Sequence, residues 1–166
     1  MAITFVKIAS TTLTVSTNTV NLSSIPSTYT DLYILAHILP VGNAQLEVQI
    51  NDSASYDRVN YYGVGASGDG SQFENSANQI NAGQMLDTTS NPNQTDIYIA
   101  NYSVSGPQKQ IYIHNHQPWT NNTSQYFYVT ASKTTNTTTV NTVTFKSTGA
   151  SFGADSTFDV YGITKL

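Results

Sequence analysis

The stretch IPSTYTDLYILAHIL, residues 25–39, decides how the rest of this chain can fold. Pro26 has no backbone N–H, and the Pro, Ser and Thr residues ahead of Tyr29 are typical of a turn. From Asp31 onward one face of the stretch is wholly apolar. That face consists of Leu32, Ile34, Ala36 and Ile38. The opposite face is nearly as apolar, so the pattern predicts a strand that is covered on both sides and lies centrally in its sheet.

Alternation of apolar and polar residues predicts strands along most of the chain. The expected strands are residues 2–9, 13–15, 20–22, 46–50, 56–62, 95–104, 109–117, 125–131, 140–146 and 156–163. The strand at 46–50 follows a turn at 40–43, and we expect it to be the hairpin partner of the strand at 31–39. No segment keeps a helical period. The sequence therefore predicts an all-β fold, a two-sheet antiparallel sandwich and in particular a jelly roll.

The regular pattern stops between residues 63 and 92, where glycines lie among Ser, Asn and Asp. Only residues 80–86 look like a further short strand. We expect a long Gly- and Asn-rich loop here, within a single domain that spans residues 1–166. Loops of this length in a compact domain are usually functional or form an interface.

Composition excludes several classes of function. The 166-residue chain carries a net charge of −4 with six Lys plus Arg, so it lacks the basic surface that nucleic-acid binding requires. It has no Cys, which excludes disulfides, thiolate metal sites and a Cys nucleophile. No apolar run approaches the roughly 20 residues that span a bilayer. The N-terminus does not resemble a signal peptide, so we expect synthesis in a cytoplasm and no membrane partner.

The acidic and hydroxyl residues do not form a recognisable catalytic pattern. Asp52, Asp57, Asp69, Glu74 and Asp87 show neither the spacing of a calcium loop nor a paired-carboxylate arrangement. No G-x-S-x-G nucleophile motif occurs. We expect a protein that is not an enzyme and that needs no cofactor.

Two histidines, His114 and His116, lie two residues apart on a predicted strand and therefore on one face. His37 joins them as a third metal ligand only if the fold brings it there. The alternative, which we favour, is a polar strand face at a subunit contact and no metal.

Tyrosine is the commonest aromatic residue, with 11 Tyr against one Trp. The candidates for a shared face lie on the predicted strands between residues 95 and 131: Tyr98, Tyr102, Tyr112, Tyr126 and Tyr128. If those strands are neighbours, they form a sheet face rich in Tyr and His, which suits subunit contacts and sugar stacking alike. Filling of the sandwich core is the alternative for each Tyr. Trp119 lies in a predicted turn, where it either contacts a sugar or a partner, or packs against the end of the sheet.

Two signatures, IPSTYTDLYI at residues 25–34 and STFDVYGI at residues 156–163, resemble those of tailed-bacteriophage virion proteins. LEVQIND at 46–52 and the Gly-rich segment after it follow a similar order. The resemblance covers most of the chain and implies a β-sandwich, a homotrimer and a place on the virion surface. It is shared by proteins of the head-decoration (cement) and tail-fibre types, and it implies no catalytic residue.

The chain shows one compact domain and no shaft, so we expect a head decoration protein that binds the major capsid protein or another virion protein. For capsid or subunit contacts we expect the N-terminal segment and the loop at 63–92. The candidate loop residues are Tyr62, Asp69, Phe73 and Met85. The alternative is a tail-fibre module that binds host surface glycan through Trp119 and exposed tyrosines. An enzyme acting on polysaccharide is a third option, which lacks a visible acidic cleft.

Overall fold

The computed structural model describes residues 3–53, 55–64, 68–87, 92–117 and 126–165. These residues form twelve strands and no helix, so no described helix is available to cross a membrane. The strands are β1 (Ile3–Thr12), β2 (Thr19–Leu22), β3 (Asp31–Ile38), β4 (Ala44–Ile50), β5 (Tyr56–Val64), β6 (Gly68–Ala77), β7 (Ile80–Met85), β8 (Asn93–Ala100), β9 (Lys109–His116), β10 (Tyr126–Thr134), β11 (Val143–Thr148) and β12 (Thr157–Lys165).

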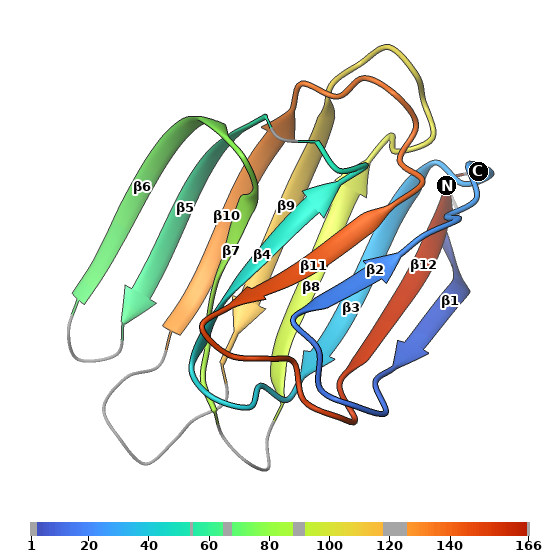
Figure 1. Cartoon of the computed structure of the whole chain (residues 1–166). Helices are drawn as coiled ribbons and strands as arrows, with labels where there is room; N and C mark the ends of the chain where they lie inside the picture. Colours follow the sequence, from blue (N-terminus) through green and yellow to red (C-terminus); the bar gives the residue numbers. More distant parts are fainter. Residues whose placement is uncertain (1–2, 54, 65–67, 88–91, 118–125, 166) are drawn as a thin grey trace.

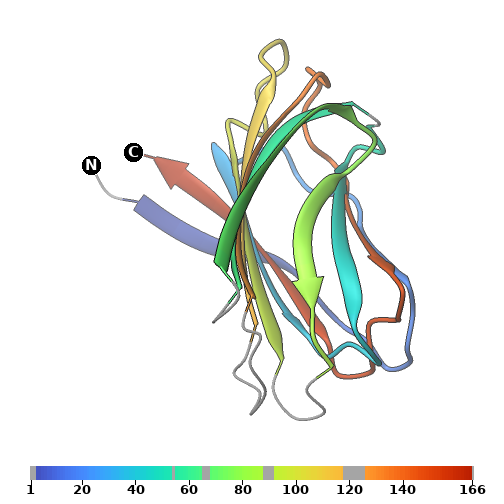
Figure 2. The same ribbon diagram turned by 90° about the vertical axis from the view of Figure 1, so that its left-hand side faces the viewer.

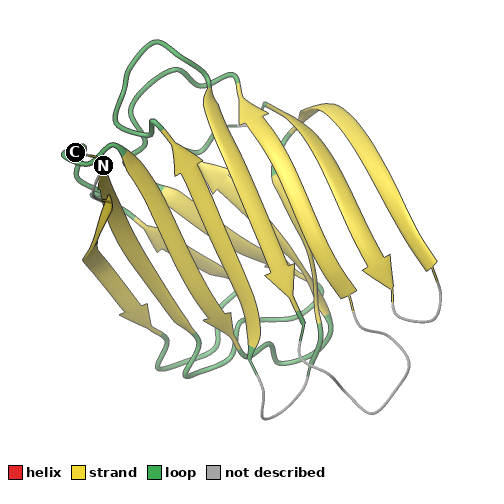
Figure 3. Ribbon diagram, turned by 180° about the vertical axis from the view of Figure 1, so that it is seen from behind, coloured by secondary structure: helices red, strands yellow, loops and turns green. Residues whose placement is uncertain are grey.

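The strands form two antiparallel sheets that pack face to face (Figures 1 and 2). The large sheet has eight strands in the order β1-β12-β3-β8-β9-β10-β5-β6, and the small sheet has four in the order β2-β11-β4-β7. Figure 3 shows the large sheet from the side that faces away from the small one. The predicted all-β, two-sheet antiparallel sandwich is confirmed.

Eight of the strands wind as a jelly roll. The quartets β1-β12-β3-β8 and β2-β11-β4-β7 face each other, and the chain changes sheet at almost every step between them. The remaining strands are two insertions: β5 and β6 lie between β4 and β7 in sequence, and β9 and β10 lie between β8 and β11. Both insertions add to the same edge of the large sheet. The predicted jelly roll is therefore present, with its large sheet widened from four strands to eight.

Strand β3 lies inside the large sheet, as the sequence predicts, between β12 and β8. Its inner side chains, such as Leu32 and Ile34, are fully buried together with Phe145 and Phe158 from the two sheets. The expected hairpin between β3 and β4 was wrong, because β4 belongs to the small sheet and pairs with β11 and β7. Alternation of apolar and polar residues indicates that a strand has a buried face, but it does not indicate to which sheet the strand belongs.

The two signature segments meet in space, and their residues hold the fold together. The N–H of Thr30 donates to the carbonyl of Ile163 at 2.9 Å. The ring of Tyr29 lies on Gly162, where a Cβ atom would overlap it. The buried Asp31 carboxylate accepts hydrogen bonds from the Tyr98 hydroxyl and, at 2.9 Å, from the N–H of Asn101. The two signatures therefore contribute structural contacts that join the start of β3 to β12 and β8.

The prediction of a long loop at residues 63–92 was wrong for most of that segment, because the segment contains β6 and β7. Strand β6 is the last strand of the large sheet, and most of its residues are exposed on both faces. A strand without a buried face has no apolar alternation, so the sequence pattern hides it. Strand β7 pairs with β4 and is mostly buried.

Candidate functional site

The outer face of the large sheet, turned away from the small sheet, carries most of the exposed aromatic side chains. The strand registers place one residue of each strand in a single row across it. In strand order the row is Lys7, Tyr161, Tyr33, Tyr98, Tyr112, Ala131, Val59 and Phe73. Residues that face each other across antiparallel strands share a face and touch. The sheet is thus crossed by one continuous, mainly aromatic row, which we call the central row.

Ring contacts order the first part of the central row. Tyr33 meets Phe5 edge to face at 6.0 Å between centroids and Tyr161 at 6.3 Å, and Tyr98 lies 6.4 Å from Tyr112. Burial among these rings raises the pKa of the Tyr33 phenol. These neighbours half-bury Tyr33, Tyr98 and Tyr161, although among the described residues no second layer covers them. The expectation that β3 is covered on both sides therefore holds only for its inner face.

The second part of the central row contains a hollow. Tyr112 and Phe73 stand on either side of the small residues Ala131 and Val59, and the resulting depression has a volume of about 310 Å³. The adjacent row, which also lines the hollow, is polar: Gln110, Lys133 and Asp57. The hollow can therefore accommodate a ring or an apolar side chain of a partner, with hydrogen-bond donors and acceptors available at one end.

Asp57 is fixed at the polar end of this hollow. Its carboxylate accepts a hydrogen bond from the N–H of Ser76 at 3.2 Å and pairs with the Lys133 ammonium, also at 3.2 Å. These two partners, the Ser76 N–H first, hold the pKa of Asp57 below its usual value. The carboxylate is therefore ionised and compensated at neutral pH, so the hollow presents no unpaired charge there.

A second hollow of about 230 Å³ lies further along the same strands. Its lining includes Tyr61, Phe127 and Val129, and Gly63 leaves open space because it has no side chain. Four rings border the two hollows and are well exposed. They are Tyr112 at 44%, Phe127 at 48%, Tyr61 at 59% and Phe73 at 65%. We call these four residues the aromatic patch; all of them lie on inserted strands.

The structure brings together part of the predicted site. Strands β8, β9 and β10 are neighbours, and Tyr98, Tyr112, His114 and His116 share the outer face. Tyr102 is instead fully buried, with its hydroxyl bonded to the carbonyl of Pro26. Tyr128 points to the inner face.

The remaining candidates divide in the same way. Tyr62 is half-buried and its ring lies 5.7 Å from that of Tyr128. Asp69 and Phe73 are exposed on β6, whereas Met85 is fully buried between the sheets. The backbone of Tyr126 begins β10. Trp119 lies outside the described residues.

The histidines do not converge on a metal-binding arrangement within the described residues. The Nδ1 of His114 lies 3.1 Å from a carboxylate oxygen of Asp96, while His116 and His37 are separated by Gln94 on the intervening strand. No group of three or more potential ligands occurs in the part of the chain that the structure describes. The outer-face location fits the polar strand face that the sequence suggested.

Sequence reasoning missed several members of the outer face. They are Phe5, Tyr33, Tyr61, Phe127 and Tyr161. Each alternates with inner residues, so strand periodicity assigns it to a face. What the sequence does not contain is the register, for example Phe127 opposite Gly63, which opens the second hollow.

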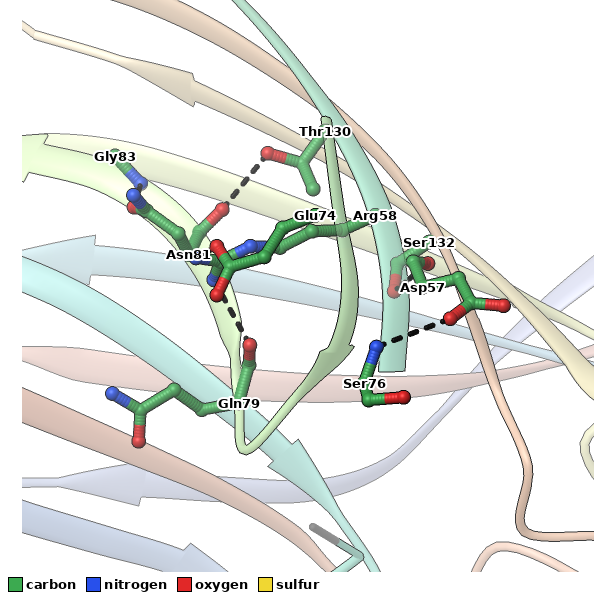
Figure 4. A network of polar contacts seen from close by, with 9 residues as sticks. All are labelled: Asp57, Arg58, Glu74, Ser76, Gln79, Asn81, Gly83, Thr130 and Ser132. Atoms are coloured by element: carbon green, nitrogen blue, oxygen red, sulfur yellow. Dashed lines mark hydrogen bonds and ion pairs between the residues drawn. The ribbon is translucent and has the colours of Figure 1, made fainter. Parts of the chain in front are cut away.

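Polar contacts on the inner face hold the inserted strands in place (Figure 4). Arg58 donates to the carbonyl of Gln79 at 2.9 Å and forms an ion pair with Glu74. Thr130 donates to the carbonyl of Asn81 at 2.9 Å, and the Asn81 side chain accepts from the N–H of Gly83 at 2.8 Å. These bonds join β5, β6 and β10 to β7 and so position the strands that carry the aromatic patch.

No protein-family model and no curated protein matches the sequence. Among solved structures, the chain is similar over 98% of its length to a chain in a structure described as "Structure of infectious bursal disease virus Gx strain". The two chains are 12% identical with a TM-score of 0.13, and this chain spans 40% of the length of the viral one. A likeness this weak carries no argument about fold or function.

Proposed function

We propose that this chain is a non-enzymatic structural component of a phage virion, a head decoration protein that self-associates and stabilises the capsid by binding its outer surface. The signatures at 25–34 and 156–163 support the virion role by resemblance. The single structural observation behind the proposal is the aromatic patch with its two hollows, displayed on a wide and rigid sheet. Large exposed rings of this kind are common anchors of protein interfaces.

The charges of the outer face favour docking by shape and apolar contact. Two ion pairs on this face compensate each other: Lys7 with Asp159 at 2.8 Å and Lys133 with Asp57 at 3.2 Å. The Asp96 carboxylate also has a polar partner, the Nδ1 of His114 at 3.1 Å. A partner therefore meets few unpaired charges. In this mechanism, rings of the patch insert into the capsid surface, and repetition over many symmetry-related positions multiplies a modest single contact through avidity.

Immunogold electron microscopy of the native particle, with antibody raised against this chain, tests the proposal. Label spread over the head is the expected result. Label confined to the tail, or particles that bear no label, would overturn the decoration role.

A second candidate function is a glycan-binding module at the tail. The observation that favours it is the hollow between Tyr112 and Phe73, because aromatic rings can stack on the apolar face of a sugar while Gln110 and Lys133 supply hydrogen bonds. Glycan-array binding that is lost in Tyr112→Ala or Trp119→Ala would support this function. Equal binding by both variants and the wild type would place any glycan elsewhere.

A further inference from the structure

The two edges of the large sheet differ in how well they are protected. Strand β6 ends one edge with polar residues, glycines and the charges of Asp69 and Glu74. Strand β1 ends the other edge, and its first residues, ITFV, contain no charge, glycine or proline. Natural edge strands are usually blunted by charges, prolines or bulges, because their free N–H and C=O groups otherwise pair with another strand. The start of β1 lacks these devices.

Apolar side chains are exposed on both faces of this part of β1. Ile3 is 60% and Phe5 57% exposed, and both point to the outer face, while Val6 is 38% exposed and points to the inner face. On the inner side the ring of Tyr29 lies on Gly162, the partner of Val6, and still leaves Val6 exposed. Figure 2 shows the ends of β1 and β12 projecting away from the body of the sandwich. Another strand can therefore approach without obstruction.

A β-bulge ends the regularly paired edge at Lys7, the one charged residue within residues 3–7. The register of β1 with β12 shifts between Lys7 and Ala9. Before the shift, residues 3–7 pair regularly with residues 161–165; beyond it, the hydroxyl of Ser10 is bonded to Asp159. Bulges bend a strand and interrupt the hydrogen-bonding ladder, so a pairing strand would be limited to residues 3–7.

We propose that residues 3–7 of β1 pair antiparallel with the same residues of a second copy of this chain. The inference rests on the proposed function, which includes self-association, and it names the residues through which two copies would contact each other. A second strand can pair with the whole row of edge backbone groups, and two identical strands meet in an isologous, two-fold contact when they run antiparallel.

The sequence of β1 is self-complementary in this arrangement. Pairing centred on Phe5 places Phe5 opposite its counterpart, Thr4 opposite Val6, and Ile3 opposite Lys7. Cross-strand aromatic pairs stabilise a sheet, and no like charges face each other. Lys7 is already compensated by Asp159 at 2.8 Å. The Phe5–Tyr33 contact of each copy would meet that of the other, so the two outer faces would join into one sheet.

This contact joins copies two at a time. It produces a dimer, or an assembly that contains two-fold axes, such as two trimers placed back to back. The chain has no Cys, so a single engineered Cys reports on the contact without background.

Light scattering with size-exclusion chromatography on Phe5→Lys and Val41→Lys tests the inference. The two side chains are similarly exposed, at 57% and 61%, and Val41 lies outside the strands and outside the aromatic patch. Phe5→Lys should halve the mass of the assembly, because two charges would then face each other, whereas Val41→Lys should leave the mass unchanged. A wild-type monomer, or an unchanged mass for Phe5→Lys, would overturn the inference.

Cross-linking of single-Cys variants gives a second result that does not depend on how Phe5→Lys folds. Under mild oxidation Phe5→Cys should form a disulfide-linked dimer, and Val41→Cys, at a similarly exposed position outside the aromatic patch, should not. Absence of the Phe5→Cys dimer would overturn the inference. The proposed function can fail separately. If the particles bear no label on the head but the chain dimerises through β1, the proposed function is wrong and this inference stands. If the heads are labelled but the chain does not pair through β1, only this inference is wrong.

Discussion

The two halves of the large sheet are built on different principles. In the jelly-roll half, β1, β12, β3 and β8, inner side chains such as Ile34 and Phe158 are fully buried against the small sheet. In the inserted half, β9, β10, β5 and β6, the inner face is largely polar, with Asn60 and Thr130 among its buried residues, and β7 is the small-sheet strand nearest to it. The first half is held by apolar burial, whereas the second combines hydrogen bonds with a smaller apolar contribution from Tyr56, Ile111 and Ile113. This separates the stable core from the face that carries the aromatic patch.

Truncation of a large ring in the jelly-roll half should have the largest effect on stability. Phe158 is fully buried and packs 4.9 Å from Phe145 and 5.8 Å from Phe152, centroid to centroid. Phe158→Ala should lower the free energy of unfolding by about 3–5 kcal/mol in a urea titration. Phe127→Ala, a matched change at an exposed ring of the inserted half, should cost within about 0.5 kcal/mol. Equal losses would contradict the proposed difference between the halves.

Replacement of a glycine by alanine should have the second largest effect on stability, and the effect should differ between the two halves. In Gly162→Ala the new Cβ would collide with the ring of Tyr29, whereas in Gly63→Ala it meets no atom within 4 Å. Overpacking typically costs about 1–3 kcal/mol, so Gly162→Ala should melt at a lower temperature than the wild type while Gly63→Ala should not. A destabilised Gly63→Ala would show that the second hollow is filled in solution.

Removal of the Arg58 guanidinium should loosen the inserted half alone. Arg58→Ala removes the hydrogen bond to the carbonyl of Gln79 and the ion pair with Glu74, and should cost about 1–2 kcal/mol. Lys133→Ala, which removes a more exposed pair with Asp57, should cost less than about 1 kcal/mol. Amide hydrogen exchange of Arg58→Ala should accelerate in β5 and β6 and stay unchanged in β3 and β12. Uniform acceleration would mean that the halves unfold as one unit.

Acidification should have the smallest effect on the free energy of unfolding, and the effect should be similar in the two halves. Burial works to raise the pKa of Asp159, but hydrogen bonds from Lys7 and Ser10 outweigh it, and Asp57 is likewise shifted down by Ser76 and Lys133. Both carboxyls therefore bind protons more weakly when folded. Their stabilisation should be complete above the unfolded pKa of 3.8 and disappear as the pH falls through the folded values.

Chemical unfolding between pH 6 and pH 2 measures this loss. Asp159→Asn and Asp57→Asn should each make the free energy of unfolding depend less steeply on pH below pH 4. Stability that rises on acidification would contradict the assigned ion pairs.

The sequence allowed β3, β8 and β12 of the jelly-roll half to be predicted because each of these strands has a buried apolar face. The alternation from Leu32 to Ile38 gave β3 and its central place, and STFDVYGI gave β12 within a few residues. The sheet to which β4 belongs was not predictable in this way, since LEVQI has the same pattern in either sheet.

The inserted half was harder to predict for a physical reason. Strand β6, GDGSQFENSA, exposes most of its residues on both faces, so no period marks it as a strand. Tyr112, His114 and His116 were found because they lie on a strand with a buried face. The hollows were not predicted, because they depend on register, which places the small residues Ala131 and Gly63 beside large rings.

Cosedimentation with expanded capsids that lack this protein tests the central proposal, that the aromatic patch binds the capsid. The test compares the wild type, the double variant Tyr112→Ser with Phe73→Ser, and a control, Val15→Ser with Val41→Ser, whose side chains are 71% and 61% exposed outside the large sheet. The account predicts that the patch variant binds at least tenfold more weakly, about 1.4 kcal/mol per site, and that the control binds like the wild type. Equal binding by the patch variant and the wild type would contradict it.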